Sequence, residues 1–215
     1  MSERWALQQI AVAEHPLLDA RGFYVDLPCP IDELVVNVRI ATQFSAAAEA
    51  ALQDGDLVQK AARDLLRWAG YKPTGRGKPA SEFLKNMAET GAMPAINPAI
   101  DTCNAVSMHS GWPISAVDAD KLTSPLEIRL GRAGERYAFN ATGQEIDLEN
   151  LLSLCDAAGP CANGVKDAQR TKTDASTRRR LVIIWGSRTC PGLAEATALW
   201  LAEQLAGLGT EVTAA

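Results

Sequence analysis

The most apolar run of the chain lies in its last fifth and limits the folds that are open to it. Residues 181–186 read Leu-Val-Ile-Ile-Trp-Gly, with three β-branched residues in succession and no charged side chain. Alternate side chains of a strand point to opposite faces of its sheet, so a strand of this composition needs cover on both faces. The run therefore predicts a central strand in a sheet with other elements packed against both sides.

Other strands are predicted where β-branched or alternating residues occur in short runs. Residues 34–40 should form a second buried strand, and residues 1–33 should contain a short strand or two between loops. Beyond residue 125, strand candidates alternate with turns that contain glycine, as in an antiparallel meander. These candidates are residues 126–130, 136–139, 145–148 and 151–156.

Three stretches have helical patterns. Residues 45–69 are rich in alanine, with Gly55 marking a point where this helix would divide and Gly70 ending it. Ser81 should cap the start of a second helix, and residues 190–208 form an amphipathic helix that closes the chain. Together these elements indicate the α+β class, with mixed and antiparallel sheets flanked by helices.

Length and composition predict a single structural domain. The chain has 215 residues, of which 47% are apolar and 22% charged. We expect residues 1–59 to form an N-terminal extension that packs on a main body of residues 60–215. The sequence has no signal peptide and no run of eighteen apolar residues, so we expect a cytoplasmic protein that contacts no membrane.

The cysteines and histidines suggest no redox centre and no metal site. Five cysteines without a CxxC pair, in a chain without a secretory signal, predict reduced thiols. The sequence has only two histidines, His15 and His109, and their spacing suggests no ligand set. No GxxxxGK[ST] loop occurs either, so we expect no metal, no cofactor and no nucleotide hydrolysis.

Basic residues form two clusters in a chain whose net charge is −5. One cluster lies within residues 60–85 and the other within residues 166–180. Local contact with phosphate explains such clusters on an acidic body, and ordinary solvated faces are the alternative explanation. The residues that we select as RNA contacts are Arg76, Lys78, Arg170, Arg178 and Arg179.

Residues 91–118 carry the densest set of turn signals in the chain. Two prolines, an Asn-Pro step and a Gly-Trp-Pro turn predict mostly irregular backbone that joins short elements. Apolar residues spread through the stretch predict that it is fixed in place, so we expect it to form one wall of a pocket. The candidate pocket residues are Asn97, Asp101, Asn104, Trp112, Pro113, Ser115 and Asp118.

These residues define no catalytic group by themselves. Asp101 and Asn104 more often fix backbone than act on a substrate, and Trp112 is more often a core residue than a stacking surface. Ser115 lacks a GxSxG elbow and His109 lacks an acid partner, so a Ser-His-Asp triad is not expected. The residues examined one by one therefore leave the catalytic residues unassigned.

Short motifs follow one another in a fixed order between residues 60 and 187. They are Pro94, Asn97-Pro98, residues 101–104, Gly111, Pro113, Asp118, Ile128-Arg129, Gly134-Glu135, Gly143, Asp156, Asp167, Thr171 and Thr177. In this order they resemble the tRNA-editing (B3/B4) domain of the phenylalanyl-tRNA synthetase β subunit, and residues 1–59 resemble the N-terminal part of its free-standing form. The resemblance implies an α+β body around a pocket that hydrolyses tyrosine wrongly attached to tRNA. It also implies tRNA or aminoacyl-tRNA as the partner, with no aminoacylation by this chain.

Two positions depart from the motifs of that family. Ser115 stands where the family has its editing histidine, and Ile183-Ile184 stand near the position of the glutamate that reads the tyrosine hydroxyl. A buried group that reads a hydroxyl contributes on the order of 10⁴-fold discrimination. Its absence predicts a pocket that does not prefer tyrosine.

Three functions are compatible with these observations. The first is an editing-like, tRNA-binding domain that hydrolyses a mischarged aminoacyl-tRNA, with Asn104 or Ser115 orienting a water molecule. The second is a non-enzymatic RNA-binding module with a vestigial pocket. The third belongs to a different class, a small-metabolite protein that binds a free amino acid and no RNA, and the acidic net charge favours it.

Overall fold

The predicted apolar strand is β9 (Arg179–Ser187), and it lies inside a four-stranded sheet. The computed structural model describes residues 4–35, 45, 47–52 and 55–215. In this sheet β9 lies between β2 (Leu18–Asp26) and β3 (Ile114–Asp118), and β10 (Glu211–Ala214) pairs with the other edge of β2. All these pairings are antiparallel. The central position of the strand is therefore confirmed.

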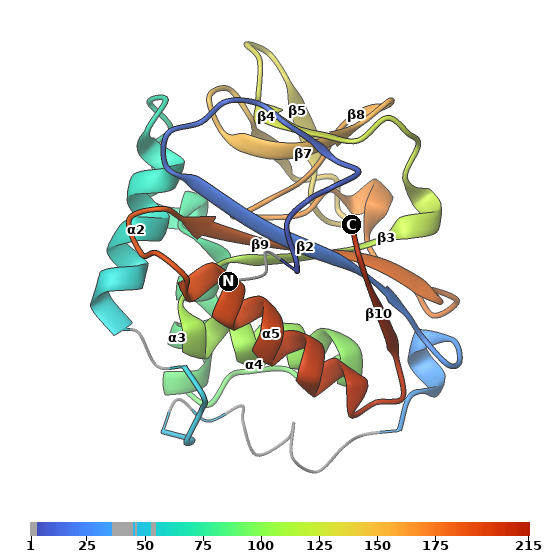
Figure 1. Cartoon of the computed structure of the whole chain (residues 1–215). Coiled ribbons are helices and arrows are strands. Elements are labelled where there is room, and N and C mark those ends of the chain that lie inside the picture. Colours follow the sequence, from blue (N-terminus) through green and yellow to red (C-terminus); the bar gives the residue numbers. More distant parts are fainter. Residues whose placement is uncertain (1–3, 36–44, 46, 53–54) are drawn as a thin grey trace.

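A second sheet lies above the central one in Figure 1, and a hairpin accompanies it. Its strand order is β1-β4-β7-β8, and only the β1–β4 pair is parallel. The strands of this layer are β1 (Ala11–Val12), β4 (Glu127–Leu130), β7 (Leu152–Asp156) and β8 (Gly159–Asn163), with β5 (Arg136–Ala138) and β6 (Glu145–Asp147) in the hairpin.

The predicted strands of this layer are present, but the predicted meander is wrong. β4 pairs with β7, whereas β5 and β6 pair with each other as a separate hairpin. The reason is burial, because Ile128 of β4 and Leu154 of β7 are both fully buried in the core between the two sheets. In the two strands of the hairpin only Tyr137 is buried, so they gain less from a place in the sheet.

Helices cover the opposite face of the central sheet, which gives the molecule three layers (Figure 1). α4 (Pro98–Ser110) and α5 (Leu193–Ala206) lie below the sheet, with α3 (Ala80–Glu89) against α4 and α2 (Gly55–Arg67) along one side. Single turns of 3-10 helix cover Ile31–Glu33, Gly75–Gly77, Ala119–Lys121 and Gln169–Thr171. These layers confirm the α+β class.

The helix predictions are confirmed in part. α2 occupies only the second half of residues 45–69, and the described residues before it are not helical. Gly70 follows its end with a φ of 103°, a conformation that glycine adopts without strain. α3 begins at Ala80, so Ser81 lies inside the helix and its side chain makes no cap. α5 is confirmed, but the strand β10 follows it.

Residues 91–118 contain far more regular structure than predicted. α4 takes thirteen of them and β3 takes five, so the expectation of mostly irregular backbone is wrong. The turn signals lie at the ends of the helix. Asn97 is its N-terminal cap, Pro98 its first residue, and Gly111 ends it with a φ of 81°. These residues delimit a helix as readily as they form turns.

The N-terminal part of the chain contributes to both sheets. β1 lies in the second sheet and β2 in the central one, which confirms the strands expected within residues 1–33. Leu34 and Val35 belong to no strand, and residues 36–40 of that prediction lie outside the described residues. The division of the chain at residue 59 stays a prediction.

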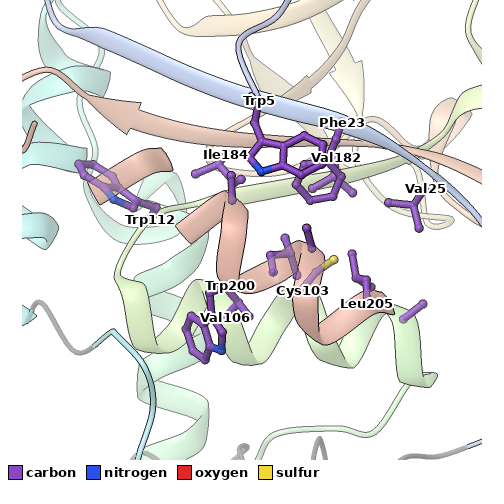
Figure 2. Packing of buried hydrophobic residues seen from close by; sticks show 14 of the residues in the cluster. Trp5, Phe23, Val25, Cys103, Val106, Trp112, Val182, Ile184, Trp200 and Leu205 are labelled. Carbon is purple, nitrogen blue, oxygen red and sulfur yellow. The ribbon is translucent and has the colours of Figure 1, made fainter. Parts of the chain in front are cut away.

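Two hydrophobic clusters explain why β9 is apolar throughout. Figure 2 shows Val182 and Ile184 facing Cys103, Trp200 and Leu205 of the helices. The alternate residues of β9, Leu181, Ile183 and Trp185, belong to the cluster between the two sheets. Because successive side chains point to opposite faces, the strand contributes to both cores.

Candidate functional site

The predicted pocket residues do not form one wall, because Asp101 and Asn104 belong to α4 and Asn97 caps it, on the helical face of the central sheet. Asn97 accepts a hydrogen bond from the Ile100 backbone nitrogen at 3.0 Å, and Asp101 accepts one from Ile96 at 3.0 Å. Burial raises the pKa of the Asp101 carboxyl, and its backbone hydrogen bonds oppose that shift. Asn104 lies further along the same helix. The contacts of Asn97 and Asp101 are those of residues that fix backbone.

Trp112 and Pro113 directly precede β3, and Asp118 is its last residue. Trp112 is fully buried in the cluster on the helical side, and the Pro113 carbonyl accepts the backbone hydrogen bond of Trp185 at 3.0 Å. Asp118 accepts hydrogen bonds from the Asp120 backbone nitrogen at 3.0 Å and from the Thr177 hydroxyl at 2.7 Å. These contacts hold the ends of the strand in place.

Ser115 differs from the other predicted pocket residues. It lies opposite Ile183 in the pairing of β3 with β9, and its side chain points to the space between the two sheets. Its hydroxyl lies 2.7 Å from Oδ1 of Asp167 and 3.1 Å from the Asn163 carbonyl, and it accepts a hydrogen bond from the Trp185 indole at 2.9 Å. Three segments far apart in the sequence therefore meet at this hydroxyl.

Asp167 is the group in this cluster that can exchange a proton. The residue keeps some contact with solvent, while its carboxyl accepts hydrogen bonds from Ser115 and from the backbone nitrogens of Asn163 and Ala116. Burial raises the pKa of the Asp167 carboxyl to about 6, and the hydrogen bond from Ser115 acts in the opposite direction. A carboxyl that titrates close to neutral pH suits acid–base chemistry.

The loop that carries Asp167 is held by a network that sequence reasoning missed. The Asn163 side-chain amide donates to the Tyr137 hydroxyl, which donates to the Lys166 carbonyl at 2.5 Å. The side-chain oxygen of Asn163 accepts backbone hydrogen bonds from Val165 at 2.8 Å and Lys166 at 2.9 Å. Burial raises the pKa of Tyr137 well above its ordinary value, so the phenol keeps its proton. The only sequence signal was the place of Asn163 at the start of a polar loop.

Two of the predicted RNA contacts lie near this site. Arg76 and Lys78 belong to the loop between α2 and α3, and the neighbouring Ala80 nitrogen donates to the Gly164 carbonyl at 2.9 Å. This hydrogen bond joins the basic loop to the segment that carries Asp167. The loop after α2 and the loop after β8 therefore form one surface.

The other three predicted RNA contacts lie elsewhere. Arg170 binds both carboxylate oxygens of Asp156, at 2.7 and 2.9 Å, and this pair lowers the Asp156 pKa against the effect of burial. Arg178 and Arg179 are at the start of β9, where Arg179 covers the Tyr24 ring at 4.6 Å from its centroid. Two of these three arginines, Arg170 and Arg179, therefore already have partners within the chain.

The described residues hold no other group of reactive side chains at this place. Within that part of the chain, no three histidine, cysteine, aspartate or glutamate residues gather where they could share a metal ion. All five cysteines of the sequence are free thiols in the structure. Among the helices of the same residues, none combines the length and apolar character that a membrane span requires.

The raised pKa of Asp167 predicts a specific dependence of stability on pH. The folded protein binds this proton more tightly than the unfolded chain, whose carboxyl titrates near 3.8, so the free energy of unfolding falls as pH rises from about 4 to about 6. The expected size is about 1–3 kcal/mol. The measurement is urea unfolding of the parent and of Asp167→Asn, which has no carboxyl at this position, at pH 4, 5, 6 and 7. The free energy of unfolding of the parent minus that of the variant should fall as the pH rises. A difference that stays constant with pH would contradict the assignment.

The architecture and the site together define a class of protein. It is a three-layer α+β domain with an enclosed serine–carboxylate contact between its two sheets. The family model described as the B3/4 domain matches residues 68–187, more than half of the chain. The chain belongs to the B3/4 domain family, and Ser115, Asp167 and Trp185 all lie in the matched region.

Curated relatives of the chain are beta subunits of phenylalanine–tRNA ligase. The subunit from Thiobacillus denitrificans is 36% identical over 97 residues, which cover 44% of this chain and 12% of that protein. The subunit from Nocardia farcinica is 26% identical over 161 residues, which cover 73% of this chain and 19% of that protein. The chain thus spans less than a fifth of the length of these relatives.

A solved structure is also similar to part of the chain. It is an N-terminal fragment of the phenylalanyl-tRNA synthetase beta subunit from Pyrococcus horikoshii, with 14% sequence identity and a TM-score of 0.47. The superposition covers 54% of this chain and 41% of that fragment.

Proposed function

We propose that this chain acts on the aminoacyl end of charged tRNA and hydrolyses the ester between the amino acid and the ribose. Membership in the B3/4 domain family and the similarity to phenylalanine–tRNA ligase beta subunits support a tRNA-related substrate. The observation that carries the proposal is the 2.7 Å contact between the buried Ser115 and Asp167, a residue that is only partly buried. Nothing in the proposal requires aminoacylation by this chain.

In the proposed reaction Asp167 is the general base. Its carboxylate takes a proton from a water molecule, and the water oxygen attacks the carbonyl carbon of the ester. The ester bond to the ribose oxygen then breaks, and that oxygen receives the proton, so the products are the free amino acid and the uncharged tRNA. A base with a pKa of about 6 is mostly ionised at neutral pH and still basic enough to accept the proton.

Ser115 is the positioning residue of this mechanism. Its hydroxyl donates to the Asp167 carboxylate, while the Trp185 indole donates to the Ser115 oxygen and fixes its orientation. Asn104, the other candidate for an orienting group, belongs to α4 on the opposite face of the central sheet. Ser115 is therefore the one of the two that the mechanism uses.

The direct test is turnover of a charged tRNA by the parent protein. We expect the protein to release tyrosine or phenylalanine from the corresponding aminoacyl-tRNA faster than the spontaneous rate, measured by acid precipitation of labelled amino acid. We also expect tRNA binding whose affinity falls steeply with salt, since phosphate contacts release counterions. Absence of turnover with both esters over hours would exclude the hydrolase.

The acidic net charge favours one alternative, a protein that binds a free amino acid and no RNA. In that case the Asp167 carboxylate would hold the α-ammonium group of the ligand. A thermal shift with free amino acids, together with no tRNA binding at low salt, would support this alternative over the proposal.

A further inference from the structure

Two cations contact Phe139, beside the loop that carries Asp167, and a third is close enough for its charge to act on one of them. The Lys166 ammonium lies 4.0 Å from the centroid of the Phe139 ring, and the Lys172 ammonium donates to the Phe139 carbonyl at 2.5 Å. The third cation is Arg76, on the basic loop that a hydrogen bond joins to the segment after β8. These residues come from three different stretches of the sequence, so their convergence is a property of the fold.

Among the described residues, no carboxylate forms an ion pair with any of these three cations. The ion pairs of the described residues involve other basic side chains, and none of them includes Arg76, Lys166 or Lys172. Asp167 is close enough for the Lys172 charge to lower its pKa, but its carboxyl is engaged by Ser115 and backbone nitrogens. Burial lowers the pKa of Lys166, and the charges of Arg76 and Lys172 lower it further. The three positive charges therefore repel one another, and the nearby Asp167 carboxylate offsets this repulsion only in part.

We infer that Arg76, Lys166 and Lys172 bind a phosphate group, and that this phosphate belongs to the RNA backbone next to the ester on which Asp167 acts. A phosphate bound between the three cations would offset their mutual repulsion with its negative charge. Guanidinium and ammonium groups both donate charge-assisted hydrogen bonds to phosphate. Lys166 and Asp167 are neighbours in the chain, so the phosphate site and the carboxyl lie at one place. The inference rests on the proposed function and adds to it the residues that hold the nucleic acid.

The test compares two triple variants with the same loss of charge. One is Arg76→Gln/Lys166→Gln/Lys172→Gln. The matched control changes three basic residues that make no ion pair among the described residues and lie outside this cluster, namely Lys60→Gln/Lys85→Gln/Arg132→Gln.

Binding of the whole charged or uncharged tRNA is then measured by fluorescence anisotropy from low to moderate salt. We expect the first variant to raise the tRNA Kd at least about tenfold at low salt and to reduce the slope of log K against log salt by about one unit, the contribution of one phosphate. The control should stay within about half a unit of the parent slope. Turnover of an aminoacyl adenosine, which carries the ester but no phosphate, should be unchanged in the control. In the first variant it should persist, with the midpoint of its pH–rate profile moved to higher pH because Lys172 no longer lowers the pKa of Asp167.

The outcomes separate this inference from the proposed function. If the first variant binds tRNA like the control, the phosphate assignment is wrong, whereas ester turnover that depends on Asp167 would still support the hydrolase. If the parent neither binds tRNA nor hydrolyses the ester, the proposed function and the RNA assignment both fail.

Inorganic phosphate identifies the source of the ligand. A thermal shift by inorganic phosphate that the first variant lacks, with tRNA binding unchanged, would assign the site to free phosphate and overturn the RNA assignment. If the first variant binds both tRNA and inorganic phosphate as well as the parent does, the inference as a whole is wrong. The double variant Arg76→Gln/Lys166→Gln keeps the contact of Lys172 with Phe139, so it repeats the test if the triple variant does not fold.

Discussion

Replacing Asp167 by asparagine is expected to lower the turnover of an aminoacyl-tRNA ester by about 10²–10⁴-fold, the usual contribution of a positioned general base. Asparagine keeps the size of the side chain but cannot accept the proton from water. In the parent, the rate should rise with pH through about 6 and then level off, because only the ionised carboxylate acts as a base. Initial rates of deacylation between pH 5 and 8 measure both effects.

Two further variants distinguish a base from a structural residue. Asp174→Asn removes an exposed carboxylate that binds Lys121 at 2.8 Å, and it should leave the rate unchanged. Ser115→Ala removes a hydrogen bond that favours the ionised form of Asp167, so the midpoint of the pH–rate profile should move to higher pH. Full activity of Asp167→Asn, or a profile that is flat around pH 6, would show that another group supplies the base.

Replacing Ile183 by aspartate is expected to destabilise the fold by about 4 kcal/mol or more. Ile183 is fully buried in the cluster between the two sheets, where the new carboxylate would have neither water nor a cationic partner. Such a loss approaches the total stability of an ordinary domain, so the variant should be largely unfolded in moderate urea. Urea unfolding followed by circular dichroism measures the change.

Val12→Asp is the matched control for this substitution. Val12 is a β-branched residue in a strand, like Ile183, but 45% of it is exposed on β1. A charge there stays hydrated, and we expect a loss below about 1 kcal/mol. Equal unfolding midpoints for the two variants would contradict the position of Ile183 in the core.

Sequence reasoning predicted those parts of the fold that are determined by the residues of one short segment. The apolar run of β9 is one example, since its composition alone requires cover on both faces. α4 was missed because Asn97, Pro98 and Gly111 are typical of turns as well as of helix ends, and the sequence does not decide between these uses. The pairing of β4 with β7 also depends on which strands bury more surface, which local pattern does not show.

The candidate site was predicted only where a motif marked it. Ser115 was selected from its place in the Gly-x-Pro motif, but its partners Asp167 and Trp185 lie 52 and 70 residues further along the chain. Contacts over such distances are set by strand pairing, and no local pattern contains them. For Arg170 the structure adds a partner that the sequence did not indicate, since Asp156 binds its guanidinium, and its selection as an RNA contact stays a prediction.

The pairing of β2 with β9 has a consequence for how the chain is made. Gly22 pairs with Ile183, about 160 residues later, so a ribosome that adds about 5–20 residues per second produces β2 roughly 8–30 s before its partner. The other neighbour of β2, β10, is synthesised later still. Such non-local pairing also slows folding of the finished chain, because a long loop must close first.

During that interval β2 exposes apolar residues that are fully buried in the finished fold, among them Phe23 and Val25. Unpaired apolar strands are prone to aggregate, and charged residues within a strand oppose this. β2 carries Asp19, Arg21 and Asp26 among its nine residues. We expect these charges to help keep the nascent strand in solution until β9, in the last fifth of the chain, has emerged.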